Sequence, residues 1–152
     1  MLLIGEALMF KRKFMSVLIE WKNKKDKKCL LVKGARQVGK TFIIREFGKQ
    51  HYKNVVELNF FENEKHKEVF AGSLDAETIY KKLSLFFKDV IFDKDTLLFL
   101  DEIQECGQAR TALKFLAEDG RCDCVASGSM LGIAYKQVAS IPVGYEQPVE
   151  MF

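Results

Sequence analysis

Residues 29–41 read Cys29-Leu30-Leu31-Val32-Lys33-Gly34-Ala35-Arg36-Gln37-Val38-Gly39-Lys40-Thr41. The apolar start predicts a strand, the last eight residues match G-x-x-x-x-G-K-[ST] at every fixed position, and a helical pattern follows. The two glycines permit backbone conformations that turn successive N–H groups toward an anion, and the next helix adds the positive end of its dipole. The stretch therefore predicts a phosphate-binding loop. A simple glycine-containing turn is disfavoured, because four fixed positions and the context agree.

The nucleotide-binding residues expected from this loop are Gly34, Ala35, Arg36, Gln37, Val38, Gly39, Lys40 and Thr41. Lys40 is expected to carry its charge to the β- and γ-phosphates, and Thr41 to offer its hydroxyl to Mg²⁺. Arg36 lies inside the loop, where contact with phosphate and capping of a neighbouring strand are both open.

A second motif ends in two carboxylates. Leu97-Leu98-Phe99-Leu100 is a continuous apolar run, typical of a parallel strand buried on both faces. Asp101 and Glu102 follow it, at the edge where ligands bind in open α/β sheets. Asp101 is expected to hold Mg²⁺ together with the loop hydroxyl. Side chains alternate along a strand, so Glu102 is expected to point elsewhere and to orient and deprotonate an attacking water. Two acids that merely cap a strand are the alternative, and the upstream loop disfavours it.

The composition fits a single soluble domain of 152 residues, 48% hydrophobic and 30% charged, with a net charge of +3. This mild charge does not by itself indicate nucleic acid. No apolar run approaches the ~18 residues of a membrane span, and the first ten residues lack the order of a secretory signal. The four cysteines have no metal-site spacing. Cys29 and Cys124 lie in strand-like runs, so buried reduced thiols and a cytoplasmic location are expected.

Hydrophobic periodicity and cap residues predict the remaining elements. Helices are expected over about 11–24, from the loop to Gly48, after an N-cap at Asp75, and over 108–118 before Gly120. Further strands are expected over 55–60, 122–126 and 149–152, with a charged connection over 62–67 and a loop between Pro142 and Pro148.

Lysines and arginines cluster between residues 11 and 28. A solvated helix face is the expected explanation, and contact with a phosphate backbone is the alternative. Asn23-Lys24-Lys25-Asp26 spells the guanine-reading motif N-K-x-D. However, a helix rather than an apolar strand precedes it, and Gln104 occupies the glycine position of D-x-x-G after Asp101. GTP specificity is therefore disfavoured.

Other polar residues suggest supporting roles. Ser127 and Ser129 end the strand expected beside Asp101, and both are placed to sense a γ-phosphate. The alternative is a turn in which they satisfy local backbone groups. Arg110 and Arg121 are the arginines that follow Asp101, and they are expected at solvent-exposed positions rather than as arginine fingers acting in trans.

The chain resembles the ATPase core of AAA-superfamily proteins of bacteria and archaea, which often carry a domain of unknown function or a nuclease-like domain behind the core. The resemblance covers most of the chain and is carried by Phe10-Lys11-Arg12-Lys13, the loop at 34–41, Asn59, Leu100-Asp101-Glu102-Ile103-Gln104 and Ser127-Gly128-Ser129. It implies an α/β fold, a parallel sheet with helices on both faces and a central loop strand, apparently without the C-terminal lid. The expected domains are an N-terminal helical extension, 1–27, and an ATPase core, 28–152, truncated after the start of the fifth strand.

The same resemblance implies ATP and Mg²⁺ as ligands. Glu102 and Lys40 are the implied catalytic residues, Thr41 and Asp101 the metal-binding ones, and Ser127 or Ser129 the sensor. Relatives continue into a lid and a further domain and often have Gly-Arg where this chain has Gly144-Tyr145. The chain is therefore expected to be a fragment. It is also expected to hydrolyse ATP slowly, because no arginine finger is expected in it and such a residue is worth roughly 10³–10⁵ in rate.

The resulting expectation is an ATPase that activates water with the help of Mg²⁺ and is coupled to a missing effector domain. The alternatives are a nucleotide-binding module without significant turnover and a small-molecule kinase. Expected partners are the nucleotide, a second copy through the nucleotide edge, and a nucleic acid or protein reached through a domain not present here. No membrane partner is expected.

Overall fold

The computed structural model describes residues 4–34, 39–129 and 146–151. Its strands are β1 Cys29–Gly34, β2 Asn54–Asn59, β3 Thr96–Asp101, β4 Asp123–Gly128 and β5 Glu146–Met151. They form one sheet in the order β2-β3-β4-β1-β5, and every neighbouring pair is parallel. The predicted parallel α/β sheet is confirmed, with the loop strand β1 inside it and β4 between β1 and β3.

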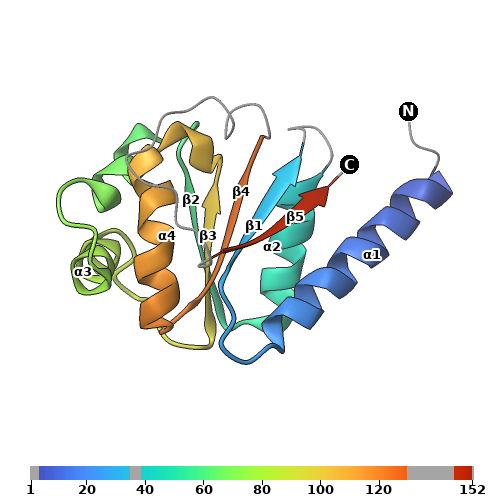
Figure 1. Ribbon diagram of the computed structural model, residues 1–152, viewed down its shortest axis with the longest axis horizontal. Coiled ribbons are helices and arrows are strands. Elements are labelled where there is room, and N and C mark those ends of the chain that lie inside the picture. Colours follow the sequence, from blue (N-terminus) through green and yellow to red (C-terminus); the bar gives the residue numbers. More distant parts are fainter. Residues whose placement is uncertain (1–3, 35–38, 130–145, 152) are drawn as a thin grey trace.

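Helices cover both faces of this sheet (Figure 1). On one face lie α1, Ile4–Lys22, and α2, Lys40–His51. The other face carries the 3-10 helix η1, Glu64–Phe70, with α3, Ala76–Phe86, and α4, Gly107–Asp119. A short 3-10 turn, η2, spans Ile103–Glu105 directly after β3. The predicted N-cap at Asp75 is confirmed, because its side chain accepts from the N–H of Thr78 at 3.0 Å.

Each face of the sheet has its own hydrophobic cluster, because successive strand residues point to opposite sides. Leu30 and Val32 of β1 pack with the helices α1 and α2, whereas Leu31 packs in the cluster of α3 and α4. All six residues of β3 are buried. The sequence-based expectation of a strand covered on both faces is therefore confirmed for β3.

Two predicted helix ends were wrong. Helix α1 begins at Ile4 rather than near residue 11, and its first residues, 4–9, are all exposed. Helix α2 continues past Gly48 to His51. Gly48 serves close packing instead of termination, since a Cβ there would lie 2.5 Å from Val55 Cγ2. Glycine thus lets α2 approach the strand β2.

Two predicted connections also differ from the structure. Residues 62–67 were expected as a charged connection, but η1 forms over Glu64–Phe70, because Asn63 caps it and Val69 and Phe70 are fully buried in the core. Pro148 was expected at the end of a loop, yet it lies within β5 opposite Leu31. Its partner loop residue Pro142 lies outside the described residues.

All four cysteines are free and buried, and burial had been predicted for Cys29 and Cys124. Within the described part of the chain, none of the helices combines the length and hydropathy that a membrane crossing requires.

Candidate nucleotide-binding site

The predicted loop joins the end of β1 to the start of α2, as the motif requires. Gly39 takes a left-handed conformation, φ 79° and ψ 15°, directly before the helix. Glycine allows this conformation without strain. The side chain of Lys40 is 2% exposed and donates from Nζ to the carbonyl of Gly34 at 2.9 Å. The ammonium of Lys40 therefore lies beside the carbonyl of Gly34 at the end of β1. Ala35, Arg36, Gln37 and Val38 lie outside the described residues.

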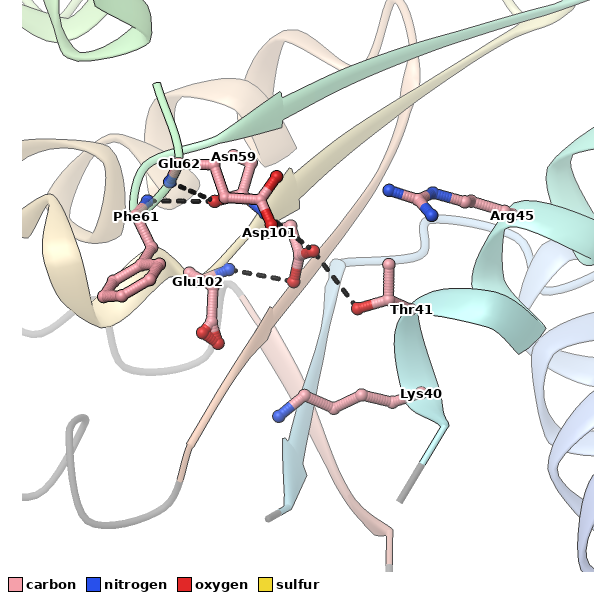
Figure 2. Close-up of a pocket in the computed structure, with 8 residues that line it drawn as sticks. All are labelled: Lys40, Thr41, Arg45, Asn59, Phe61, Glu62, Asp101 and Glu102. Atoms are coloured by element: carbon pink, nitrogen blue, oxygen red, sulfur yellow. Dashed lines mark hydrogen bonds between the residues drawn. The ribbon is translucent and has the colours of Figure 1, made fainter. Parts of the chain in front are cut away.

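Asp101 is a point where several elements meet (Figure 2). Its Oδ2 accepts from Thr41 Oγ1 at 3.1 Å and from Asn59 Nδ2 at 3.3 Å. Its Oδ1 accepts from Ser127 Oγ at 2.5 Å and from the backbone N–H of Glu102 at 3.0 Å. The carboxylate is 3% exposed. Residues of α2, β2 and β4 thus hold one carboxylate at the end of β3.

Glu102 departs from the strand in a left-handed conformation, φ 57° and ψ 48°. A non-glycine residue in this region is strained, and such strain is concentrated at functional sites. Figure 2 shows Asp101 turned toward Thr41 and Glu102 pointing in another direction. The predicted divergence is present, but its cause is the left-handed turn rather than strand alternation, since β3 ends at Asp101.

Gln104 of η2 holds the second carboxylate. Its Nε2 donates to Glu102 Oε2 at 3.3 Å, and the two side chains are 5% and 6% exposed. The Oε1 of the same amide is buried without a hydrogen-bond partner. A buried orphan acceptor beside a strained carboxylate calls for an explanation by strain, function or water.

The two carboxylates and the loop residues Lys40 and Thr41 line one cavity of about 410 Å³ at the carboxyl edge of the sheet. The cavity lies between the start of α2 and the ends of β2 and β3 (Figure 2). Its lining residues are Lys40, Thr41, Arg45, Asn59, Phe61, Glu62, Asp101 and Glu102. The structure therefore brings the loop lysine and threonine together with both carboxylates of the second motif.

Asn59 contributes to the resemblance, but the sequence alone predicted no role for it. Asn59 lies opposite Asp101 in the register of β2 and β3, and its Oδ1 accepts from the N–H groups of Phe61 and Glu62 at 2.9 Å each. The available signal was its position after an apolar strand, because the ends of parallel strands share one edge. Arg45, which binds Glu57 through two bonds of 2.6 and 2.7 Å, had no comparable signal.

The oxygen atoms of this site fit a magnesium ion bound with a nucleotide. Mg²⁺ is held by one or two carboxylates together with phosphate oxygens and water, rather than by a complete protein cage. Thr41 and Asp101 supply a hydroxyl and a carboxylate 3.1 Å apart. Across the described residues, no three histidine, cysteine or acidic side chains gather as a self-sufficient metal site.

Three further predictions concern supporting residues. Ser127 is fully buried against Asp101, whereas Ser129 is half-buried after the end of β4. Arg110 was expected at an exposed position, and this is wrong. Its side chain is 7% exposed, because it lies on the buried face of α4. Arg121 instead pairs with Asp119 and Glu77 beyond the end of α4.

The N-K-x-D sequence lies far from this cavity. Asn23 and Asp26 belong to the turn between the end of α1 and β1, at the amino edge of the sheet. Asp26 has a positive φ of 52° in that turn. A guanine-reading role for this motif therefore has no support from the fold.

A family model described as an AAA domain matches residues 26–152. The chain belongs to the AAA family. The match spans both motifs and every strand, and the resemblance to a P-loop ATPase core of the AAA superfamily is confirmed. Among curated proteins, no sequence matches the chain significantly.

Solved structures show the same AAA fold. The Aeropyrum pernix ORC1 protein in complex with DNA matches with a TM-score of 0.61 and 13% identity, over 95% of this chain and 44% of that one. Drosophila ORC bound to DNA matches with a TM-score of 0.62 and 11% identity, over 93% and 42%. Drosophila ORC bound to AT-rich DNA and Cdc6 matches with 0.62 and 13%, over 97% and 57%. The chain thus spans about half the length of these structures, and identities this low establish the fold alone.

Proposed function

We propose that this AAA domain binds Mg-ATP in the cavity at the carboxyl edge and hydrolyses it slowly. The observation that carries the proposal is the contact of 3.1 Å between Thr41 Oγ1 and Asp101 Oδ2. Two groups that P-loop enzymes use to hold magnesium are 60 residues apart in the sequence and adjacent in the fold.

Binding relies on the loop and the start of α2. Lys40 presents a charge within a buried site, where its attraction to phosphate exceeds that in water. The N–H groups at the start of α2 and the helix dipole also favour an anion. The chain thereby supplies both charge and directed donors for the phosphates.

Hydrolysis relies on the second motif. Magnesium, when bound with the nucleotide, neutralises charge that develops on the phosphate oxygens. Asp101 orients Thr41, Asn59 and Ser127 around itself. Glu102 is assigned as the base that takes a proton from water, and Gln104 restrains its carboxylate. Ser127 is favoured over Ser129 as the sensor, since its hydroxyl contacts the aspartate.

A pair of substitutions tests this assignment. Lys40→Ala is expected to abolish Mg-ATP binding measured by calorimetry, because it removes the buried ammonium group that would bind the phosphates. Glu102→Gln is expected to leave the Kd within about threefold and to lower phosphate release by roughly 10²–10⁴-fold, the range for a general base. Unchanged turnover in Glu102→Gln at saturating ATP would reassign the base. Failure of the wild-type chain to bind ATP would refute the proposal as a whole.

Two alternatives to ATP hydrolysis predict different outcomes of these measurements. A nucleotide-binding module would bind Mg-ATP, lose binding in Lys40→Ala, and release no phosphate even at high protein concentration. A kinase would instead transfer phosphate to an added metabolite. The strained Glu102 inside the cavity favours water activation over both alternatives.

A further inference from the structure

Three loops meet at the amino edge of the sheet, opposite the nucleotide cavity. The first, residues 22–28, joins α1 to β1. Lys22 Nζ lies 4.8 Å from the centroid of the Tyr52 ring in the second loop. The N–H of Lys53 donates to the carbonyl of Asp95 in the third loop at 2.8 Å. Lys28 and Lys94 line the same small cavity. Segments far apart in the sequence thus form one surface.

This surface carries lysines in excess. Residues 22–28 contain five lysines and one aspartate, a net charge of +4, whereas the whole chain has a net charge of +3. The amino-edge lysine cluster is defined here as the exposed side chains Lys24, Lys25, Lys28, Lys53 and Lys94. The exposed carboxylates on the same loops are Asp26, Asp89, Asp93 and Asp95, and the third loop also carries the exposed Lys88. The excess of positive charge therefore remains after these acids are counted.

The backbone that presents the cluster is anchored. Lys27 Nζ donates to the carbonyl of Lys22 at 3.0 Å and pairs with Asp123 Oδ1 at 3.2 Å. Trp21 Nε1 donates to the carbonyl of Lys28 at 2.9 Å. The segment is thus tied at both ends to the buried core. A fixed backbone reduces the ordering entropy that a ligand must overcome.

The side chains present indicate the kind of ligand. Lysine ammonium groups bind phosphates as point charges, without the fixed fork of arginine. The aromatic rings of this surface, Trp21 and Tyr52, are 1% and 8% exposed, so they provide no stacking platform of the kind that single strands use. Residues 22–28 contain no apolar side chain that would insert into a membrane, and the large apolar side chain exposed on the third loop, Ile91, is a single residue rather than an apolar patch.

We infer that the amino-edge lysine cluster binds the phosphate backbone of a nucleic-acid duplex without reading its sequence. This binding is separate from the proposed ATPase activity, because the cluster and the nucleotide cavity lie at opposite edges of the sheet. Duplex and nucleotide are therefore expected to bind together, and Lys40→Ala is expected to retain duplex binding.

The test is the binding of a fluorescent DNA duplex to the whole chain, measured by anisotropy without nucleotide. The variant Lys24→Gln/Lys25→Gln/Lys28→Gln is compared with Lys13→Gln/Lys65→Gln/Lys81→Gln, which removes the same charge from exposed positions of α1, η1 and α3. Salt is varied between about 50 and 200 mM. Thermal melting establishes that both variants fold.

The cluster variant is expected to bind more than about tenfold more weakly at the lower salt, and its slope of log K against log salt to become less negative by about 2.7. The control variant is expected to stay within about twofold of the wild type. Equal losses in both variants would reduce the effect to net charge and overturn the inference. Absence of duplex binding would also overturn it, including the case in which vesicles of anionic lipid bind instead.

Discussion

Two buried aspartates lie at opposite edges of the same sheet, and their surroundings differ. Asp101 at the end of β3 is 3% exposed, and Asp123 at the start of β4 is 4% exposed. Asp123 accepts from the hydroxyl of Tyr52 and pairs with Lys27 at 3.2 Å. The four donors that bind Asp101 are two hydroxyls, an amide and a backbone N–H, all of them neutral.

The difference separates a structural carboxylate from one that suits a ligand. A buried charge is costly unless it is paired. The chain supplies a cation to Asp123, and burial together with the bond to this carboxylate raises the pKa of Tyr52, so the phenol stays protonated. Asp101 receives neutral donors and borders a cavity of about 410 Å³. Compensation by an ion from outside is therefore available at Asp101, in keeping with the proposed site.

The largest expected effect is a difference in stability between variants of Asp123 and Asp101. Asp123→Ala is expected to lower the free energy of unfolding by about 3 kcal/mol, because Tyr52 and Lys27 lose a buried partner. Asp101→Ala is expected to cost about 1.5 kcal/mol or less, since three of its four donors, from Thr41, Asn59 and Glu102, belong to residues that border a cavity that admits water. Urea denaturation of both variants without nucleotide measures the two effects.

The same two variants also separate function. Asp101→Ala is expected to remove the gain in ATP affinity that Mg²⁺ provides, whereas Asp123→Ala at a temperature where it is folded is expected to retain that gain. If both variants lost equal stability and both lost the magnesium effect, Asp123 and Asp101 would not differ in the proposed way, and the assignment of a structural and a ligand-binding carboxylate would be wrong.

A smaller effect concerns Gln104. Gln104→Leu removes the donor to Glu102 and also the orphan Oε1, with little change in shape. We expect turnover to fall by about tenfold, within the range of a lost hydrogen bond to a charged group, with the Kd for Mg-ATP almost unchanged. Stability is expected to change little, since removal of an unsatisfied buried acceptor offsets the hydrogen bond lost by Glu102. A less stable variant with normal turnover would show that Gln104 is only structural.

The smallest effect is a pH dependence through His66. Burial lowers the pKa of His66, and its Nδ1 accepts from the N–H of Asn59 at 3.0 Å. The folded chain therefore binds fewer protons than the unfolded chain. The stability linked to His66 is fully present above the unfolded pKa of about 6.5 and is lost as pH falls through the lower folded value.

This dependence is measured as the melting temperature of the wild type and of His66→Gln at a series of pH values. The wild type is expected to lose more stability on acidification than His66→Gln. His51→Gln, at the exposed end of α2, is the matched control and is expected to follow the wild type. Parallel curves for all three proteins would show that His66 is not the titrating group.

Sequence reasoning succeeded where a feature is local. The loop at 34–41, the buried strand before Asp101 and the cap at Asp75 each follow from neighbouring residues, and the fold built on them is confirmed. It was wrong where a distant contact decides the outcome. Gly48 was expected to end α2, but it packs against Val55, and Arg110 was expected to be exposed, but α4 presents it to the interior.

The sequence by itself determined that the chain has a phosphate-binding loop, two carboxylates after a buried strand, and the AAA fold that combines them. Only the tertiary structure decided that Asn59 and Ser127 bind Asp101 and that Lys27 neutralises Asp123. The physical reason is that a motif consists of residues that are neighbours in the sequence, so it can be identified without the fold. Partners across a sheet depend instead on strand order and register, which arise when the two hydrophobic clusters pack on its faces.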